Sequence, residues 1–595
     1  MKYRWLWASL VLGLGLVLGI VACRPAVKPP PALSKHFEEP EEDPGPDLLE
    51  NITVSSGIDF SYDNGENTAN HMTILESLGG GVALIDYDGD GLLDIFFPGG
   101  GHFTGKDKKT ITGSPCKLYR NLGKGKFEDV TAKVGLDKLA GGKPWFYTHG
   151  AAVGDYNRDG FSDLLVTGWG RIALFRNDPV DPKDPKKGRK FTDVSAEAGL
   201  DKGIEWASSA AFGDLDGDGW PDLYVCQYVD WSWKNNPACS YDGKTPDVCP
   251  PKNFAGLQHK VFRNLTNGKF ADVTLEAGIV PGGPDASKGL GVLMMDTDGD
   301  GKPEIYVAND TVDNFLYLNQ SKPGKIILVE KGLHSGVARD DKAAQNGSMG
   351  VDGGDYNHTG KPSIWVTNYE NELHALYRND GRKGMQFFSF QTSEAGIAVL
   401  GQRYVGWGTA FFDADLDGWE DLFVANGHAI RYPTGQGVTR KQRPVLMLNR
   451  DGKFRVVSKR IGDYGRAEHL SRGAAFGDLD NDGRIDIVIS NQNEQAGILR
   501  GIGGKDHHWI GVQLVGKEHA CIVGSRVVLE ANGMKQSRFS KGGGSYASSN
   551  DRRHHFGLGK ATKIDKLTVH WADGSKQEYT DLAIDKYHRL EQGKK

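Results

Sequence analysis

The stretch SAAFGDLDGDGWPDLYV at residues 209–225 contains the pattern that decides the fold. Its centre, DLDGDGWPD, has acids at positions 1, 3, 5 and 9 and a glycine at position 6. A small, apolar segment precedes this centre and a second apolar segment follows it. The arrangement predicts two strands joined by a tight acidic loop.

The same pattern occurs seven times along the chain, about every sixty residues, which predicts one supersecondary unit per copy. The copies read DYDGDGLLD from Asp86, DYNRDGFSD from Asp155, DLDGDGWPD from Asp214, DTDGDGKPE from Asp296, DYNHTGKPS from Asp355, DADLDGWED from Asp413 and DLDNDGRID from Asp478.

Two further strand patterns follow most copies, one like LYRN at residues 118–121 and one like FEDVT at 127–131. Four short strands per unit, repeated seven times, predict an all-β, seven-bladed β-propeller over residues 50–503. The seventh copy has no FEDVT-like strand of its own. We therefore expect residues 52–58 (ITVSSGI) to complete the seventh blade and close the ring.

The first residues predict export. Lys2 and Arg4 precede an apolar stretch from Leu6 to Val21, and the small residue Ala22 precedes Cys23. This ending resembles a bacterial lipobox, so we expect a signal peptide at residues 1–22 and a lipid on Cys23. An ordinary signal peptide or an uncleaved anchor helix are the alternatives. Residues 23–49 are rich in proline and acids and predict a disordered tether.

The acidic loops predict calcium sites, because calcium takes six to eight oxygen ligands. Side chains at positions 1, 3, 5 and 9 and the carbonyl at position 7 would supply them, with about six ions in all. The predicted ligands are Asp86, Asp88, Asp90, Leu92 and Asp94; Asp155, Asn157, Asp159, Phe161 and Asp163; Asp214, Asp216, Asp218, Trp220 and Asp222; Asp296, Asp298, Asp300, Lys302 and Glu304; Asp413, Asp415, Asp417, Trp419 and Asp421; and Asp478, Asp480, Asp482, Arg484 and Asp486.

Two other interpretations of the loops are weaker. An EF-hand needs glutamate at position 12, where these six copies have Phe97, Val166, Val225, Val307, Val424 and Ile489. Plain acidic turns would place four like charges together without a cation, which is unfavourable. The fifth copy has one carboxylate, Asp355, and we expect no calcium there.

Several segments resemble known families. FGDLDGDG at residues 212–219 and FGDLDNDG at 476–483 are similar to the FG-GAP/VCBS repeats of integrin α-subunit propellers. SYASSNDRRHHFGLG at 545–559 and VHWADGSKQEY at 569–579 resemble the ASPIC/UnbV signature. Nearly all of residues 50–592 resembles cartilage acidic protein-like chains and bacterial lipoproteins that pair the two. The resemblance implies a small β-rich domain at residues 504–595 and little specific chemistry.

No catalytic constellation is evident, so we lean against an enzyme. The loops opposite the calcium loops carry aromatic and polar residues that suit ligand recognition; the candidates are Trp145, Trp231, Trp233 and His428. Trp231 and Trp233 lie in a long insertion at residues 228–254, where both indoles would point to the same side. Cys239 and Cys249 lie close together in it, and we expect a disulfide in an exported protein.

These observations favour a calcium-stabilised, lipid-anchored binding or adhesion protein of the bacterial cell envelope that recognises a protein or glycan. A lyase-like carbohydrate-active enzyme on the same face and a structural envelope scaffold remain the alternatives. The chain has no basic tract, so nucleic acid is not an expected partner.

Overall fold

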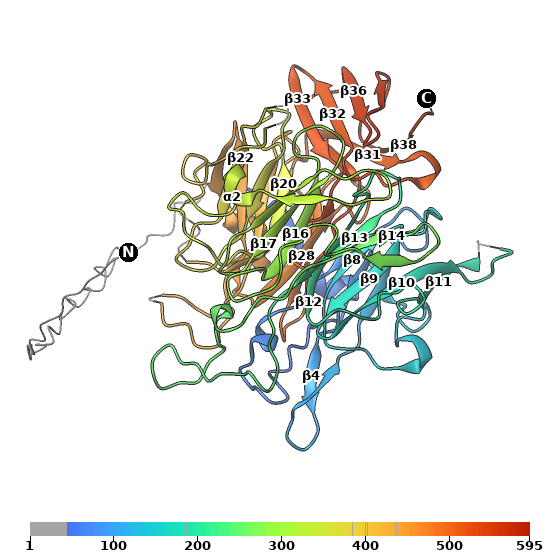
Figure 1. The fold of residues 1–595 in the computed structure, drawn as a ribbon. Helices are drawn as coiled ribbons and strands as arrows, with labels where there is room; N and C mark the ends of the chain where they lie inside the picture. Colours follow the sequence, from blue (N-terminus) through green and yellow to red (C-terminus); the bar gives the residue numbers. More distant parts are fainter. Residues whose placement is uncertain are drawn as a thin grey trace, which may run out of the picture. The chain divides into compact units, whose positions relative to one another are not determined.

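The computed structural model describes residues 45–594, apart from 185–186, 383–384, 399, 401–402 and 436. This part of the chain contains seven antiparallel sheets of similar construction (Figure 1). The strands are β2, β3, β6 and β7 (Ala83–Ile85, Asp94–Phe97, Lys117–Asn121, Phe127–Asp129) in sheet one; β8 to β11 (Thr148–Gly154, Asp163–Gly168, Arg171–Pro179, Arg189–Asp193) in sheet two; β12 to β15 (Ala207–Gly213, Asp222–Gln227, Lys260–Asn264, Phe270–Asp272) in sheet three; β16 to β19 (Gly289–Met295, Glu304–Asn309, Phe315–Asn319, Leu328–Glu330) in sheet four; β20 to β23 (Val351–Gly354, Ser363–Val366, Ala375–Asn379, Phe388–Phe390) in sheet five; β24 to β27 (Gly406–Phe412, Asp421–Asn426, Val445–Arg450, Lys453–Val456) in sheet six; and β28 to β30 (Ser471–Gly477, Asp486–Asn491, Gly497–Gly501) with β1 (Leu49–Asn51) in sheet seven.

Each sheet buries both of its faces against its neighbours. Leu164 of β9 packs in a cluster with sheet one, and the next residue, Leu165, packs in a cluster with sheet three. Successive side chains of a strand point to opposite faces, so continuous apolar strands such as DLLV suit this position. Clusters of this kind join every pair of neighbouring sheets, including the seventh and the first. The innermost strands contact one another in the same cyclic order, and the fold is a β-propeller.

The N-terminal segment closes the ring, but the expected strand at residues 52–58 was wrong. β1 (Leu49–Asn51) pairs with β30, and Thr53–Ser56 form the short helix α1, which ends at Gly57 in the left-handed conformation. The first sheet explains the difference. There Phe127–Asp129 form the strand, and the residues that follow turn back through a bond from the Val134 amide to the Val130 carbonyl. The FEDVT-like motif therefore marks the end of the outer strand.

The remaining elements are a hairpin and two C-terminal sheets. The hairpin β4–β5 (Gly101–Thr104, Thr110–Gly113) lies at the end of Figure 1 opposite the C-terminal strands, and α2 (Gly332–Ser335) and α3 (Asp463–Arg466) are single turns. The C-terminal sheets pack around a core of their own. They comprise β35, β31 and β38 (His554–Gly559, His508–Val515, Tyr587–Glu591), and β33, β32, β36 and β37 (Met534–Phe539, Arg526–Ala531, Lys566–His570, Lys576–Tyr579).

A segment of the C-terminal region, residues 542–549, enters the axis of the propeller. It starts with β34 (Gly542–Gly543), which pairs with β16 of sheet four. The segment then makes hydrogen bonds to all seven sheets, and we call it the channel plug. Its partners in sheets one to seven are Leu84, Ala151, Ser209, Val292, Val351, Thr409 and Ala474.

The sequence makes room for the channel plug through glycine. A Cβ atom on Gly81 would lie 1.9 Å from the carbonyl oxygen of Ala547, and one on Gly150 would lie 2.6 Å from the same atom. Both distances are shorter than atoms tolerate, so these positions need glycine where the backbones approach. Gly81 and Gly150 are therefore explained by the segment that fills the axis.

Candidate metal sites

The acidic loops lie at one end of the propeller, because each joins the first and second strands of its sheet. We call them loops one to seven, at residues 86–94, 155–163, 214–222, 296–304, 355–363, 413–421 and 478–486.

Backbone hydrogen bonds orient the acids of each loop, as loop three illustrates. Asp214 at position 1 accepts a bond of 2.7 Å from the amide of Gly219 at position 6. Asp222 at position 9 accepts bonds from the amides of Leu215 and Asn264, at 2.9 and 2.8 Å. Gly219 has a φ of 87°, which glycine adopts without strain. The side chains are thus held in place before any ligand arrives.

The loops bring acidic oxygens close together. Among the described residues, groups of three carboxylates whose ligand atoms all lie within 4.8 Å of one another occur in loops one, three, four, six and seven. These groups are Asp86, Asp88 and Asp94; Asp214, Asp216 and Asp218; Asp296, Asp298 and Asp300; Asp413, Asp415 and Asp421; and Asp478, Asp480 and Asp486.

The electrostatics of these groups suit a cation. Burial, with the neighbouring acids adding to it, raises the pKa of Asp214 and of Asp296 to about 6, and burial raises the pKa of Asp478 to about 7. The Oδ1 atoms of Asp88 and Asp415 are buried and have no hydrogen-bond partner. Unpaired buried carboxylate oxygens are costly, and a divalent cation would satisfy them. These clusters can therefore hold metal ions, and their all-oxygen donor set is the type that calcium prefers.

Loops two and five differ from the rest. In loop two, Asn157 donates to Asp159 at 3.3 Å, and the guanidinium of Arg189 lies 3.8 Å from the same carboxylate. In loop five, Asp355 is buried and accepts a bond of 2.8 Å from the amide of Gly360. Thr359 donates to the Asn357 side chain at 3.1 Å, so neutral groups occupy the positions of the acids. Metal binding in loop two stays a prediction, as does its absence from loop five.

In some sheets, an arginine on the third strand forms an ion pair with the acid at position 3 of the acidic loop. Arg120 Nε lies 2.7 Å from Asp88 Oδ2 in loop one, and Arg450 lies 3.4 Å from Asp415 in loop six. In sheets two and five, where position 3 of the loop is asparagine, the equivalent arginine pairs with the acid two residues further along the chain. Those pairs are Arg176 with Asp178 and Arg378 with Asp380, both at 2.8 Å.

The expected ligand residues at the other end of the propeller are mostly buried. Trp145 is 4% exposed and donates to the Leu136 carbonyl, so it packs between sheets one and two. His428 is fully buried, with Nε2 3.4 Å from Glu370 Oε1. Neither side chain forms an open binding surface.

The expectation of two exposed indoles on one side of the insertion was wrong. Trp231 is 3% exposed, packs against Trp206 in the central cluster, and donates to Asn236 Oδ1 at 2.9 Å. Trp233 is partly buried against His71 and Phe103. The sequence could not show that the segment folds back over the axis, where apolar side chains are covered rather than displayed.

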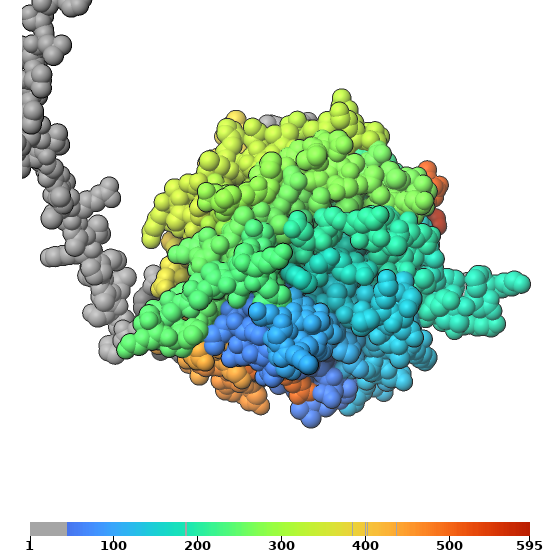
Figure 2. Space-filling model, turned by 60° about the horizontal axis from the view of Figure 1, so that its bottom comes forward, coloured from blue at the N-terminus to red at the C-terminus, as the bar shows by residue number. Residues whose placement is uncertain are grey.

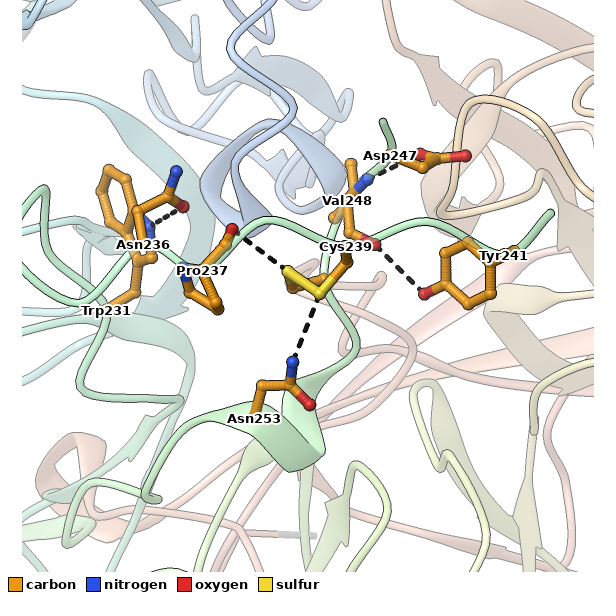
Figure 3. The surroundings of a disulfide bond; sticks show 9 residues. Trp231, Asn236, Pro237, Cys239, Tyr241, Asp247, Val248 and Asn253 are labelled. Carbon is orange, nitrogen blue, oxygen red and sulfur yellow. Dashed lines mark hydrogen bonds between the residues drawn. A yellow bond between two sulfur atoms is a disulfide. The ribbon is translucent and has the colours of Figure 1, made fainter. Parts of the chain in front are cut away.

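The insertion lies across this face of the propeller, where Figure 2 shows it as part of the green surface. Cys239 and Cys249 form a disulfide, as expected (Figure 3). Asp247 accepts bonds of 2.8 Å from the amides of Arg431 and Tyr432, which ties the insertion to sheet six. The insertion therefore covers one end of the channel.

The loop face is covered by the C-terminal region, which sequence reasoning did not foresee. Tyr587 donates to Asp478 Oδ2 at 2.9 Å, and the Cys521 amide donates to the Gly219 carbonyl at 3.0 Å. The Gly559 amide donates to the Leu416 carbonyl at 2.8 Å. The segment SYASSN contributes to the channel plug, and its small residues were the one signal of a close approach.

The predicted lipidation site Cys23 and the signal peptide lie outside the described residues. Among the residues that the structure describes, no helix is both long enough and apolar enough to cross a membrane.

Two family models match parts of the chain. Residues 516–595 match the ASPIC and UnbV family, and residues 86–166 and 155–225 match the FG-GAP-like repeat.

Sequence comparison with individual proteins also finds relatives of this chain. The chain is 27% identical over 321 residues to cartilage acidic protein 1 of Mus musculus, covering 52% of this chain and 46% of that protein. The Homo sapiens protein gives 27% over 321 residues, with 52% and 44% covered. The match thus spans about half the length of these relatives. Among solved structures, a lectin of Agrocybe aegerita that recognises non-reducing terminal N-acetylglucosamine is 15% identical, with a TM-score of 0.37 over 69% of this chain and 86% of that chain.

Proposed function

We propose that this chain, which combines FG-GAP-like repeats with an ASPIC/UnbV domain and is homologous to cartilage acidic protein 1, is a calcium-stabilised, lipid-anchored binding protein of the cell envelope. It recognises a protein or glycan ligand through the propeller face opposite the acidic loops. The observation that carries the proposal is the three-carboxylate group repeated in five loops, two of which, loops one and six, contain buried carboxylate oxygens without a hydrogen-bond partner.

Calcium is the metal that these loops favour. Calcium binds carboxylate and carbonyl oxygens at flexible geometry, whereas magnesium demands a near-ideal octahedron and retains several waters. Each site takes its ligands from the end of one strand, the loop and the start of the next strand. Binding energy therefore stabilises the fold itself.

We place the ligand on the face opposite the acidic loops because the other two surfaces, the loop face and the channel, are covered by parts of the chain itself. The acidic loops face the C-terminal region, and the channel axis holds the channel plug. A ligand of protein or glycan size therefore finds open surface on the insertion and the loops beside it.

Two tyrosines on that surface replace the tryptophans as ligand candidates. Tyr241 and Tyr432 are 42% and 51% exposed. The Tyr241 hydroxyl donates to the Val248 carbonyl, and the Tyr432 amide donates to Asp247, so the two rings emerge beside the same short segment. Exposed aromatic rings that are held in place stack on sugars and anchor protein partners.

The ligand proposal is tested with the chain from residue 24 onward, exported behind an ordinary cleavable signal peptide so that it has no anchor, and applied to a glycan array and to pull-downs from the native envelope. A Tyr241→Ala/Tyr432→Ala variant should lose any ligand captured while its melting temperature stays close to that of the parent. The control Leu122→Ala/Val180→Ala alters exposed residues in turns between third and fourth strands and should bind normally. Capture that survives the tyrosine change would place the site elsewhere.

The anchor rests on the sequence Ile20-Val21-Ala22-Cys23. Mass spectrometry of the mature protein should find an acylated N-terminal cysteine. Replacing residues 1–23 with an ordinary cleavable signal peptide should move the protein from the membrane to the soluble fraction. A mature chain that begins at another residue would exclude the anchor.

A further inference from the structure

The C-terminal region contacts the backbone of the acidic loops themselves. It donates to the loop carbonyls of Gly219, Gly360, Leu416 and Asp478, in loops three, five, six and seven. In loop two the loop is the hydrogen-bond donor, because Arg158 donates to the Glu518 carbonyl of the C-terminal region at 2.8 Å. In loop four the backbones touch, since a Cβ on Gly301 would lie 2.4 Å from the Ala572 carbonyl oxygen.

Such contacts depend on the shape of each loop. A carbonyl can accept a bond from the C-terminal region only while the loop holds that carbonyl at the surface in one orientation. A metal ion fixes the loop because it binds several of its oxygens at once. Without a cation, carboxylates within 4.8 Å of one another repel, and the loop relaxes toward conformations that separate them.

Beside loop five, contacts between the propeller and the C-terminal region do not depend on a metal ion. Here Arg538 Nε of the C-terminal region lies 3.3 Å from Oε1 of Glu420, a residue of loop six whose carboxylate also accepts a bond from the Asp355 amide of loop five. Lys541 Nζ, next to the channel plug, lies 2.6 Å from Asp352 Oδ1. Glu420 and Asp352 are both buried, so these protein cations balance buried acids beside the loop that has only one.

We propose that calcium in the acidic loops controls the docking of the C-terminal region and, through it, the seating of the channel plug. This inference rests on the proposed calcium binding. With calcium bound, the loop carbonyls hold the C-terminal region against the propeller. The channel plug then keeps its hydrogen bonds to the seven sheets. Without calcium, the ion pair of Lys541 with Asp352 beside loop five retains the region while the other contacts loosen, and the channel plug opens at times.

Loops one and seven form a matched pair for the test. Loop seven bonds directly to the C-terminal region through Asp478, whereas loop one faces His519 and Arg553 across a cavity of about 240 Å³. Asp88 and Asp480 hold the same position 3 in the two loops. Neither Asp88→Asn nor Asp480→Asn removes the bonds of Asp478 to Tyr587 and Arg553.

The experiment measures amide hydrogen exchange in peptides covering residues 542–549 of the full chain, with calcium and with excess EGTA. EGTA should speed exchange roughly tenfold or more, because the channel-plug amides then exchange by local opening rather than by global unfolding. In calcium, both variants should lose one ion by metal analysis, but only Asp480→Asn should speed exchange of the channel plug.

Three outcomes would overturn the inference. Equal acceleration in both variants would show that calcium acts only through global stability. Unchanged exchange after an ion is lost, or after EGTA, would show that docking is independent of calcium while the calcium sites themselves stand. A parent protein that contains no calcium by metal analysis would end both the inference and the proposed calcium function.

Discussion

Loops three and five occupy the same place in their sheets but balance charge differently. Loop three gathers Asp214, Asp216 and Asp218 within 4.8 Å, whereas loop five has Asp355 beside neutral side chains. Both make the same turn, because Gly219 and Gly360 at position 6 have φ values of 87° and 76°. The turn is therefore set by glycine and by backbone bonds to the acid at position 1. The other acids are free to serve a metal, and where they are missing the chain places protein cations nearby.

The largest effect is expected when the metal is removed from all loops at once. Excess EGTA should lower the melting temperature by about 10 °C or more. A site held at a hundredfold its Kd contributes about 2.7 kcal/mol, and several sites add. For a chain of this size each kcal/mol shifts the melting temperature by roughly 1 °C. Differential scanning calorimetry with metal analysis makes the measurement.

The control for chelation is readdition of metal. Calcium in excess over EGTA should restore the melting temperature, and magnesium at the same concentration should restore less of it, because these loops do not impose octahedral geometry. A melt that EGTA leaves unchanged, with no calcium in the protein, would contradict the proposal for loops such as loop three.

The second test separates loops three and five directly. Asp214→Ala should remove one calcium ion and lower stability by about 3 kcal/mol, the contribution of one well-occupied site. Asp355→Ala should leave the number of bound ions unchanged, although it leaves the Gly360 amide without its acceptor. Metal content per folded molecule is the measurement. Equal losses of calcium from the two variants would show that loop five binds metal.

Much of the fold could be predicted from the sequence because it repeats. Seven copies of one loop, each with apolar strands on both sides, predicted four-stranded sheets around a common axis, and the family matches support that fold. The error at residues 52–58 came from reading the FEDVT-like motif as a strand throughout. Its first residues pair and its last residues turn, and no local pattern distinguishes the two halves.

The surfaces were harder to predict because they depend on contacts between distant segments. Trp231 looks like a surface residue in a polar insertion, but the insertion crosses the axis and buries it beside Trp206. The channel plug has small and polar residues with no apolar period, so it resembles a loop. Its true environment follows from glycines some 400 residues earlier, such as Gly150, which leave space for the Ala547 carbonyl.

The smallest expected effect concerns how tightly individual loops bind. Arg120 pairs with Asp88 of loop one, whereas sheet four has Leu318 at the same strand position. The guanidinium repels an incoming cation and already occupies one oxygen of a predicted ligand. The Arg120 side chain is partly exposed, and a pair near the surface is worth about 0.2–1 kcal/mol, so Arg120→Leu should tighten calcium binding at loop one by roughly 1.5- to 5-fold. Leu318→Arg should weaken calcium binding at loop four by a similar factor.

The midpoint of calcium-dependent hydrogen exchange in peptides covering residues 86–94 and 296–304 reports each loop separately. Arg378→Leu is the matched control, because that arginine pairs with Asp380, two residues further along the chain, beside a loop with one acid. If Arg378→Leu shifts the midpoint of loop one as much as Arg120→Leu does, long-range charge explains the effect, and the pairing of Arg120 with Asp88 does not tune loop one.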